Sequence, residues 1–245
     1  MARSAKPKAK PAPAPRGVDR VLAPWRWTVR WVLRGLMGLG AAIVALVLLF
    51  AVVNPPTTIT MLSEGWRLGG VEQDWVAMEE IAPVMARSAV AAEDADFCLH
   101  WGFDVAAIRA ALADGGTRGG STISQQVVKN VFLWQGRSWP RKALEALITP
   151  LVELVWSKRR ILEVYLNIAE MGEGVFGVKA AAAAHFGVSP EALSARQAAL
   201  LAAVLPSPRT RSASQPSKQV RRRAASIMDG AETIRADGRA ACFED

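Results

Sequence analysis

Near its middle the chain reads Arg118-Gly119-Gly120-Ser121-Thr122-Ile123-Ser124-Gln125-Gln126, a glycine turn that leads into five hydroxyl and amide side chains. Glycine lets the backbone approach a partner closely, and Ser121 and Thr122 are suitable caps for a helix that starts near Ser124. Taken alone, the turn fits a capped helix start as well as it fits a ligand site. Charged and polar motifs flank it on both sides, and they favour a site.

The excess positive charge of the chain is confined to its N-terminal arm. The 245 residues carry a formal net charge of +8, from 30 basic and 22 acidic side chains. Residues 1–34 hold nine of the basic side chains and one acidic residue, Asp19, so the remainder is balanced. This distribution removes the main argument for a nucleic-acid partner.

An uncharged apolar stretch follows the arm. It runs over 19 positions, residues 35–53, and ends before Asn54-Pro55-Pro56. A bilayer span needs about 20 apolar residues, whereas the core of a cleaved signal peptide, the competing interpretation, is shorter. We therefore expect a retained single-pass anchor. Because basic residues stay on the cytoplasmic side, the arm is expected in the cytoplasm and the rest in the periplasm, at a bacterial inner membrane.

The pattern divides the chain into five parts and predicts a mainly α fold. These are a basic disordered arm (1–34), a transmembrane helix (35–53), a linker (54–70) with a short strand at Thr57–Met61, a helical domain (71–228) and a loosely held tail (229–245). Helices are expected from Asp74 with a break at Pro83, at Val84–Glu93, from Asp104, at Ser124–Leu133, from Pro140 with a kink at Pro150, at Lys158–Ile168, at Val178–Phe186, after Ser189-Pro190, at Ala198–Leu205 and at Lys218–Met228.

Cysteine and histidine are too sparse for a zinc site. The separation of Cys98 and Cys242 forbids a short metal-ligand spacing, and His100 and His185 are too few and too scattered to complete a site. A disulfide is permitted outside the cytoplasm, but the sequence does not require one.

Glu93 is the first candidate for chemistry. It ends the apolar segment Ala89–Ala92, where partial burial raises the basicity of a carboxylate and suits a general base. The alternative is a solvated helix-end carboxylate beside Asp94. His100, Asp104 and Ser121 suggest a serine hydrolase, but no Gly-x-Ser-x-Gly turn surrounds the serine, and we disfavour that class.

Arg141, Lys142 and Glu145 form a second candidate group. Residues at i and i+4 share a helix face, so the plain interpretation is an intrahelical ion pair. The functional interpretation is a diphosphate site, to which Lys129 adds a cation and the turn adds donors from Ser121, Thr122 and Gln126.

Together these motifs resemble the peptidoglycan glycosyltransferase family, in its monofunctional biosynthetic branch, since no transpeptidase-sized region follows. The matching motifs lie in order along the chain: Glu93-Asp94-x-x-Phe97-x-x-His100-x-Gly102-x-Asp104, Gly119-Gly120-Ser121-Thr122-x-x-Gln125-Gln126-x-x-Lys129-Asn130, Arg141-Lys142-x-x-Glu145, Ile161-Leu162-Glu163-x-Tyr165-Leu166-Asn167, and Gly172 to Gly187. The similarity extends from about Val71 to Met228.

The resemblance implies a two-lobed, lysozyme-like α fold that polymerises lipid II into the glycan strands of the cell wall. By motif position, Glu93 is the base on the acceptor 4-hydroxyl, and Glu145 assists departure of the donor diphosphate. The implied substrate-binding residues are Asp94, Phe97, Ser121, Thr122, Gln126, Lys129, Asn130, Arg141 and Lys142. A divalent cation (Mg²⁺ or Mn²⁺) is often used in the family, although no certain protein ligands for it are apparent. The implied partners are lipid II, the growing glycan, the bilayer, and cell-wall synthesis and division proteins.

Several points stay open at this level. The segment between Asp104 and Arg118 is short and contains Gly115-Gly116, which suggests a trimmed or unusually flexible loop over the donor site. Phe132-Leu133-Trp134 and Trp139 are either core residues or contacts to the outer leaflet. A lysozyme-like hydrolase or lytic enzyme acting on peptidoglycan and a noncatalytic wall-synthesis scaffold remain the alternative functions.

Overall fold

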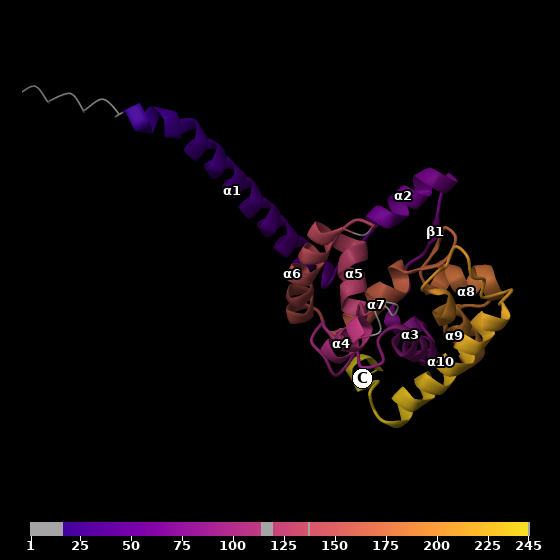
Figure 1. Cartoon of the computed structure of the whole chain (residues 1–245). Helices are drawn as coiled ribbons and strands as arrows, with labels where there is room; N and C mark the ends of the chain where they lie inside the picture. Colours follow the sequence, from indigo (N-terminus) through magenta and orange to yellow (C-terminus); the bar gives the residue numbers. More distant parts are fainter. Residues whose placement is uncertain (1–16, 114–119, 137, 245) are drawn as a thin grey trace, which may run out of the picture. The chain divides into compact units, whose positions relative to one another are not determined.

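The computed structural model describes residues 17–113, 120–136 and 138–244 (Figure 1). The chain forms two compact units, Met1–Ala45 and Leu46–Asp245, which are described separately. The arm before Gly17, the predicted loop at Gly115-Gly116 and the glycine-turn residues Arg118-Gly119 lie outside the described residues.

The first unit contains most of helix α1, Gly17–Phe50. Its stretch Trp25–Phe50 is long and apolar enough to cross a membrane, which fits the predicted single-pass anchor. The helix begins well before the predicted span at residue 35. A disordered arm up to residue 34 is therefore wrong for residues 17–34, because the low-complexity composition that suggested disorder ends at Arg16.

The second unit begins with the last turn of α1 and continues into helix α2, Ile59–Leu68. We predicted a strand at Thr57–Met61, and this prediction is wrong. The β-branched run there is typical of a strand, but the Thr58 hydroxyl accepts a hydrogen bond from Met61 N at 3.1 Å and caps a helix instead.

The helix predicted from Asp74 is also wrong. That region forms strand β1, Glu72–Gln73, and the 3-10 helix η1, Met78–Glu80. The strand joins a small sheet of order β1-β3-β2, with β2 at Glu170–Gly172 and β3 at Val175–Phe176. The β1 and β3 strands are parallel, and β2 and β3 are antiparallel.

Most of the other predicted helices are present. The predictions for α3 (Pro83–Glu93), α7 (Lys158–Ile168) and α8 (Val178–Phe186) are confirmed almost to the residue. The remaining elements are α4 (Val105–Ala113), α5 (Ile123–Phe132), α6 (Trp139–Val155, with Pro150 inside), η2 (Pro190–Ala192), α9 (Ala195–Val204), α10 (Lys218–Ala236) and α11 (Ala241–Glu244).

These helices pack in two groups (Figure 1). In one, α3, α9 and α10 pack on one another, and every residue of α9 from Ala198 to Val204 is buried. In the other, α5 packs on both α6 and α7. The mainly α fold is thus confirmed, and α3 and α5 bring the first two motifs of the sequence together where the groups meet.

The C-terminal end is not a loose tail. Helix α10 continues past Met228 to Ala236, and Phe243 in α11 is fully buried. Cys242 forms a disulfide with Cys98, with 5.7 Å between their Cα atoms. The prediction failed because these contacts join residues more than 140 positions apart, which no local pattern reveals.

Candidate active site

Glu93 is the last residue of α3, and its carboxylate is mostly buried. Gln126 Nε2 donates to Glu93 Oε2 at 3.1 Å, and Arg223 Nη2 lies 3.5 Å from Oε1. Burial raises the pKa of Glu93, and the Gln126 hydrogen bond with the charges of Arg223 and Lys129 offsets part of that rise. The side chain is therefore more basic than a solvated glutamate.

Gln126 is itself held in position from behind. The hydroxyl of Tyr165, a fully buried residue of α7, donates to Gln126 Oε1 at 3.5 Å. This contact uses the amide oxygen and turns the amide NH₂ group toward Glu93.

A cavity of about 430 Å³, the Glu93 cavity, opens beside this carboxylate. Its walls are formed by the end of α3, the following loop, the start of α4 and the residues before α5. The polar side chains that line it are Glu93, Asp94, Asp96, Asp104, Ser121 and Thr122.

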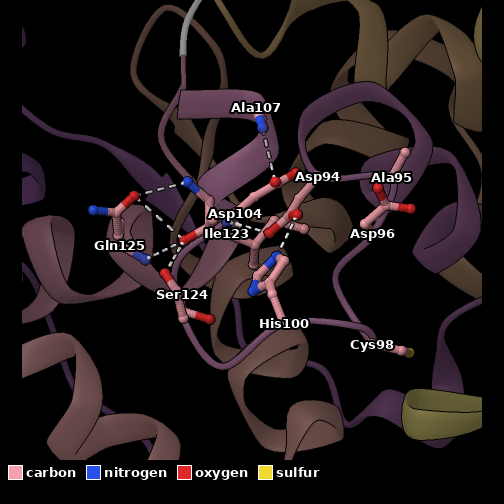
Figure 2. Close-up of polar contacts among 12 residues, drawn as sticks. Asp94, Ala95, Asp96, Cys98, His100, Asp104, Ala107, Ile123, Ser124 and Gln125 are labelled. Atoms are coloured by element: carbon pink, nitrogen blue, oxygen red, sulfur yellow. Dashed lines mark hydrogen bonds and ion pairs between the residues drawn. The ribbon is translucent and has the colours of Figure 1, made fainter. Parts of the chain in front are cut away.

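Asp94 joins the end of α3 to the start of α5 (Figure 2). Its side chain is almost fully buried; Oδ2 accepts from Ile123 N at 2.9 Å, and Oδ1 lies 2.7 Å from His100 Nε2. His100 is thus paired with Asp94 and not with Ser121, so no serine-hydrolase triad forms. Asp94 lines the Glu93 cavity, but both of its oxygens are used by the protein.

Thr122 and Phe97, both predicted to bind substrate, have structural roles here. Thr122 is 2% exposed and caps α5 in a reciprocal capping box with Gln125, while its hydroxyl donates to Gly102 O at 2.7 Å. Phe97 has no exposed surface, and its ring packs against Phe243. Phe97 thus packs in the core, and its assignment to substrate stays a prediction.

Arg141, Lys142 and Glu145 share one face of α6, as their spacing predicts. Arg141 Nη1 donates to Glu145 Oε2 at 2.7 Å, and the Lys142 ammonium is paired with Oε1. Glu145 is only 2% exposed, so two cations neutralise a buried carboxylate. Gly136 O accepts from Arg141 Nε at 2.8 Å and fixes the guanidinium further.

A second cavity of about 390 Å³, the Glu145 cavity, lies over this cluster. Lys129 of α5 lines it, and burial lowers the pKa of Lys129, with the nearby Glu145 carboxylate opposing that change. Among the described residues, no carboxylate lies within ion-pair distance of Lys129. Its ammonium is therefore available to an anion.

Two side chains link the cavities. Ser121 lines both, and its hydroxyl accepts from Lys142 Nζ at 3.1 Å. Gln126 lines the Glu145 cavity while it binds Glu93. The predicted residues Glu93, Ser121, Gln126, Lys129, Arg141, Lys142 and Glu145 are thus brought into one continuous site.

Asn130 lies apart from this arrangement. Its Oδ1 accepts from Gln135 Nε2 at 3.0 Å, and it lines a further cavity of about 400 Å³ on the side of Thr60 and Arg209. Lys129 and Gln126 also border that cavity, so Asn130 lies next to the site.

The aromatic residues considered for membrane contact divide into two kinds. Leu133 is buried, and the ring of Phe132 packs against Phe50 and Trp156. Trp134 and Trp139 are exposed, Trp139 at 88%. Of the residues considered, the two tryptophans are the ones with exposed side chains.

The residues present do not form a protein cage for a divalent cation. The described part of the chain contains no group of three or more acidic, histidine or cysteine side chains arranged to hold a metal. Both oxygens of Glu145, the nearest carboxylate to the cations, are taken by Arg141 and Lys142. We therefore derive no step through a protein-bound metal.

Sequence reasoning missed Arg223 and a buried ion pair. The chain has three consecutive arginines at 221–223, and no local signal distinguishes the one that reaches Glu93 from α10. Glu153 of α6 accepts from the Ser124 hydroxyl and from Lys158 Nζ, which ties the start of α5 to α6 and α7. Ser124 was noted only as a polar member of the turn.

Comparison with known proteins gives concordant matches. A family model described as Transglycosylase matches residues 61–232. A biosynthetic peptidoglycan transglycosylase of Jannaschia sp. (strain CCS1) is 67% identical over 214 residues, which cover 87% of this chain and 90% of the relative. Proteins of the same description from Stutzerimonas stutzeri (strain A1501) and Pseudomonas putida (strain GB-1) are 54% and 52% identical, covering 78% and 80% of this chain and 84% and 87% of the relatives.

Proposed function

We propose that this chain polymerises lipid II into glycan strands in the linked Glu93 and Glu145 cavities. The chain belongs to the transglycosylase family and is a peptidoglycan glycosyltransferase of lysozyme-like fold. The observation that carries the proposal is the pairing of a carboxylate of raised pKa with a cluster of cations, joined by Ser121 and Gln126.

Glu93 acts as the general base in this proposal. It takes the proton from the acceptor 4-hydroxyl as that oxygen attacks the anomeric carbon of the donor sugar. A buried carboxylate of raised pKa is a stronger proton acceptor than a solvated one, and Gln126 holds it in one orientation. The carboxylate must be ionised to act, so the activity requires a pH above the pKa of Glu93.

The Glu145 cavity receives the leaving group. As the bond between the anomeric carbon and the diphosphate oxygen breaks, negative charge collects on the diphosphate, and Lys129, Arg141 and Lys142 stabilise it. Glu145 holds Arg141 and Lys142 in place, and the Ser121 hydroxyl adds a donor at the entrance. The cations are positioned before the charge develops.

This arrangement favours transfer over hydrolysis. Glycosidases place two carboxyl groups about the scissile bond, one of them protonated to assist a poor sugar leaving group. Here both oxygens of the second carboxylate, Glu145, are paired with Arg141 and Lys142 of its own helix. A diphosphate needs charge neutralisation in place of protonation, and the cation cluster supplies it.

The membrane supplies the remaining context. We place α1 as a single-pass anchor in the inner membrane, with the basic arm in the cytoplasm and the site in the periplasm. Trp134 and Trp139 are exposed and are available for contact with the lipid tail of the substrate. Protease digestion tests the orientation: the arm should be cleaved in inverted vesicles and protected in spheroplasts, and the reverse result would reject it.

The deciding experiment incubates the full-length protein in detergent with lipid II and, separately, with finished glycan. Polymer from lipid II supports the proposal, whereas shortened glycan without polymer would establish the hydrolase alternative. Glu93→Gln should abolish polymerisation; if wall synthesis in cells were unaffected by this change, the scaffold alternative would hold. Parallel reactions with a chelator test whether a divalent cation bridges the diphosphate.

A further inference from the structure

The loop that follows Glu93 is held from two opposite sides. This 94–104 loop connects α3 to α4, and on one side Asp94 binds Ile123 N and His100. Figure 2 shows Asp96 and Cys98 on the other side of the loop, away from α5. Residues 218–244, which include α10 and α11, contact this second side of the loop, and we call them the C-terminal segment.

The C-terminal segment contacts the loop and Glu93 at three successive points. Arg223 Nη2 donates to Ala92 O at 3.2 Å and lies 3.5 Å from the Glu93 carboxylate. Arg239 Nη1 donates to Ala95 O at 3.0 Å and to Asp96 Oδ1 at 2.9 Å. Cys242 is bonded to Cys98.

The segment is itself anchored to the body of the protein. Gly230 of α10 lies so close to α3 that an added Cβ would come within 3.2 Å of Ala91 Cβ. Phe243 is fully buried against Phe97, and its carbonyl oxygen accepts from Arg159 Nη1 at 2.9 Å. The C-terminal segment, itself packed against the protein core, thus contacts the residues on either side of Glu93.

We propose that the C-terminal segment is a positioning element for catalysis, in which Arg223 orients the Glu93 carboxylate and the Cys98–Cys242 disulfide, with Arg239, fixes the 94–104 loop behind it. The inference rests on the proposed role of Glu93. Its physical basis is that a general base acts only at hydrogen-bonding distance from the proton it removes, so small displacements reduce turnover strongly.

The disulfide is tested with Cys98→Ser/Cys242→Ser in the full-length protein. Because the loop is freed while the cation cluster is untouched, kcat should fall about tenfold at a temperature where the variant remains folded, with KM changed less than about twofold. Circular dichroism in the same detergent checks that the variant is folded. A kcat equal to that of the unaltered protein would overturn the role of the disulfide.

Reduction provides an independent form of the same test. Dithiothreitol donates two electrons and two protons to the disulfide and leaves two thiols. The unaltered protein should then fall to the rate of the double variant and recover when oxidised glutathione re-forms the bond, while the double variant should not respond. Equal activity of the reduced and oxidised protein would contradict the proposal.

Arg223 is tested by the pH dependence of kcat/KM. The charged and titratable groups around Glu93 are Arg223 from α10, Lys129 from α5, Tyr165 from α7 and the adjacent Asp94. The Arg223 cation lowers the pKa of Glu93, so Arg223→Gln should move the acidic limb of the profile to higher pH. Arg223→Lys should move it back.

Arg235→Gln is the matched control, because Arg235 lies on the same helix and, among the described residues, forms its ion pair with the exposed Glu232. An acidic limb that stays in place in Arg223→Gln would overturn the role of Arg223. If Glu93→Gln itself polymerises lipid II at the normal rate, the proposed role of Glu93 as the base fails, and this inference fails with it. If that variant is inactive while the disulfide and Arg223 variants behave normally, only the positioning role is rejected.

Discussion

Two glutamates lie at the two ends of the site, and their surroundings differ sharply. Glu93 receives one amide hydrogen bond and one cation at 3.5 Å, and burial raises its pKa. Glu145 is more deeply buried but is neutralised by two cations of its own helix. The Glu93 carboxylate is left free to accept a proton from substrate, whereas both oxygens of Glu145 are occupied by Arg141 and Lys142.

The difference predicts opposite consequences of the same conservative substitution. Glu93→Gln removes the proton acceptor, so the rate of lipid II polymerisation should fall about 10²- to 10⁴-fold. Glu191→Gln, at an exposed glutamate far along the chain, is the matched control and should leave the rate unchanged. A Glu93→Gln variant of normal activity would remove the distinction between the two carboxylates.

Glu145→Gln should instead damage stability together with activity. It leaves buried Arg141 without its carboxylate, and breaking such a pair costs about 3 kcal/mol of unfolding free energy. Thermal unfolding of the full-length protein in detergent measures the effect. Adding Arg141→Gln to this variant should recover part of the lost stability but not the activity, and recovery of both would contradict a leaving-group role for the cations.

The pH dependence of activity should report Glu93. Because burial raises its pKa above the ordinary value of 4.5, kcat/KM should decline as the pH falls while still above 4.5. Initial rates of polymerisation across that range measure this limb. A profile that is flat down to pH 4.5 would mean that the base is a fully solvated carboxylate or a different residue.

The smallest expected effect concerns the stability contribution of Glu93. Its pKa is raised in the folded state, so folding is most favourable where the carboxyl is protonated, and the contribution is lost as the pH rises through that pKa. At neutral pH Glu93→Gln should therefore raise the free energy of unfolding by about 1 kcal/mol. If Glu93→Gln and Glu145→Gln lowered the free energy of unfolding equally, the two carboxylates would not differ in their contribution to stability.

Local sequence signals predicted the parts of the fold that local contacts determine. The composition and spacing of residues along the chain located α3, α7 and α8, and the i, i+4 spacing placed Arg141 and Glu145 in contact. Two local predictions failed: at α2 a β-branched run outweighed the capping hydroxyl of Thr58, and the helix expected from Asp74 is replaced by β1 and η1.

Contacts between distant residues account for what the sequence could not predict. Arg223 reaches Glu93 across 130 positions, and the buried position of Phe97 depends on Phe243. A motif match says that such a residue matters, but it does not say whether the residue faces a ligand or the core. Phe97 was assigned to substrate for that reason.

The disulfide joins two parts of the site that are synthesised at different times. Cys98 leaves the ribosome 144 residues before Cys242, so the nascent chain contains Glu93 and its loop long before the residues that grip them. Until synthesis reaches α11, the chain contains the residues through which the loop contacts α5 but not both Arg239 and Cys242. A chain whose synthesis stops early carries both glutamates and the cation cluster, yet its site is left unfinished.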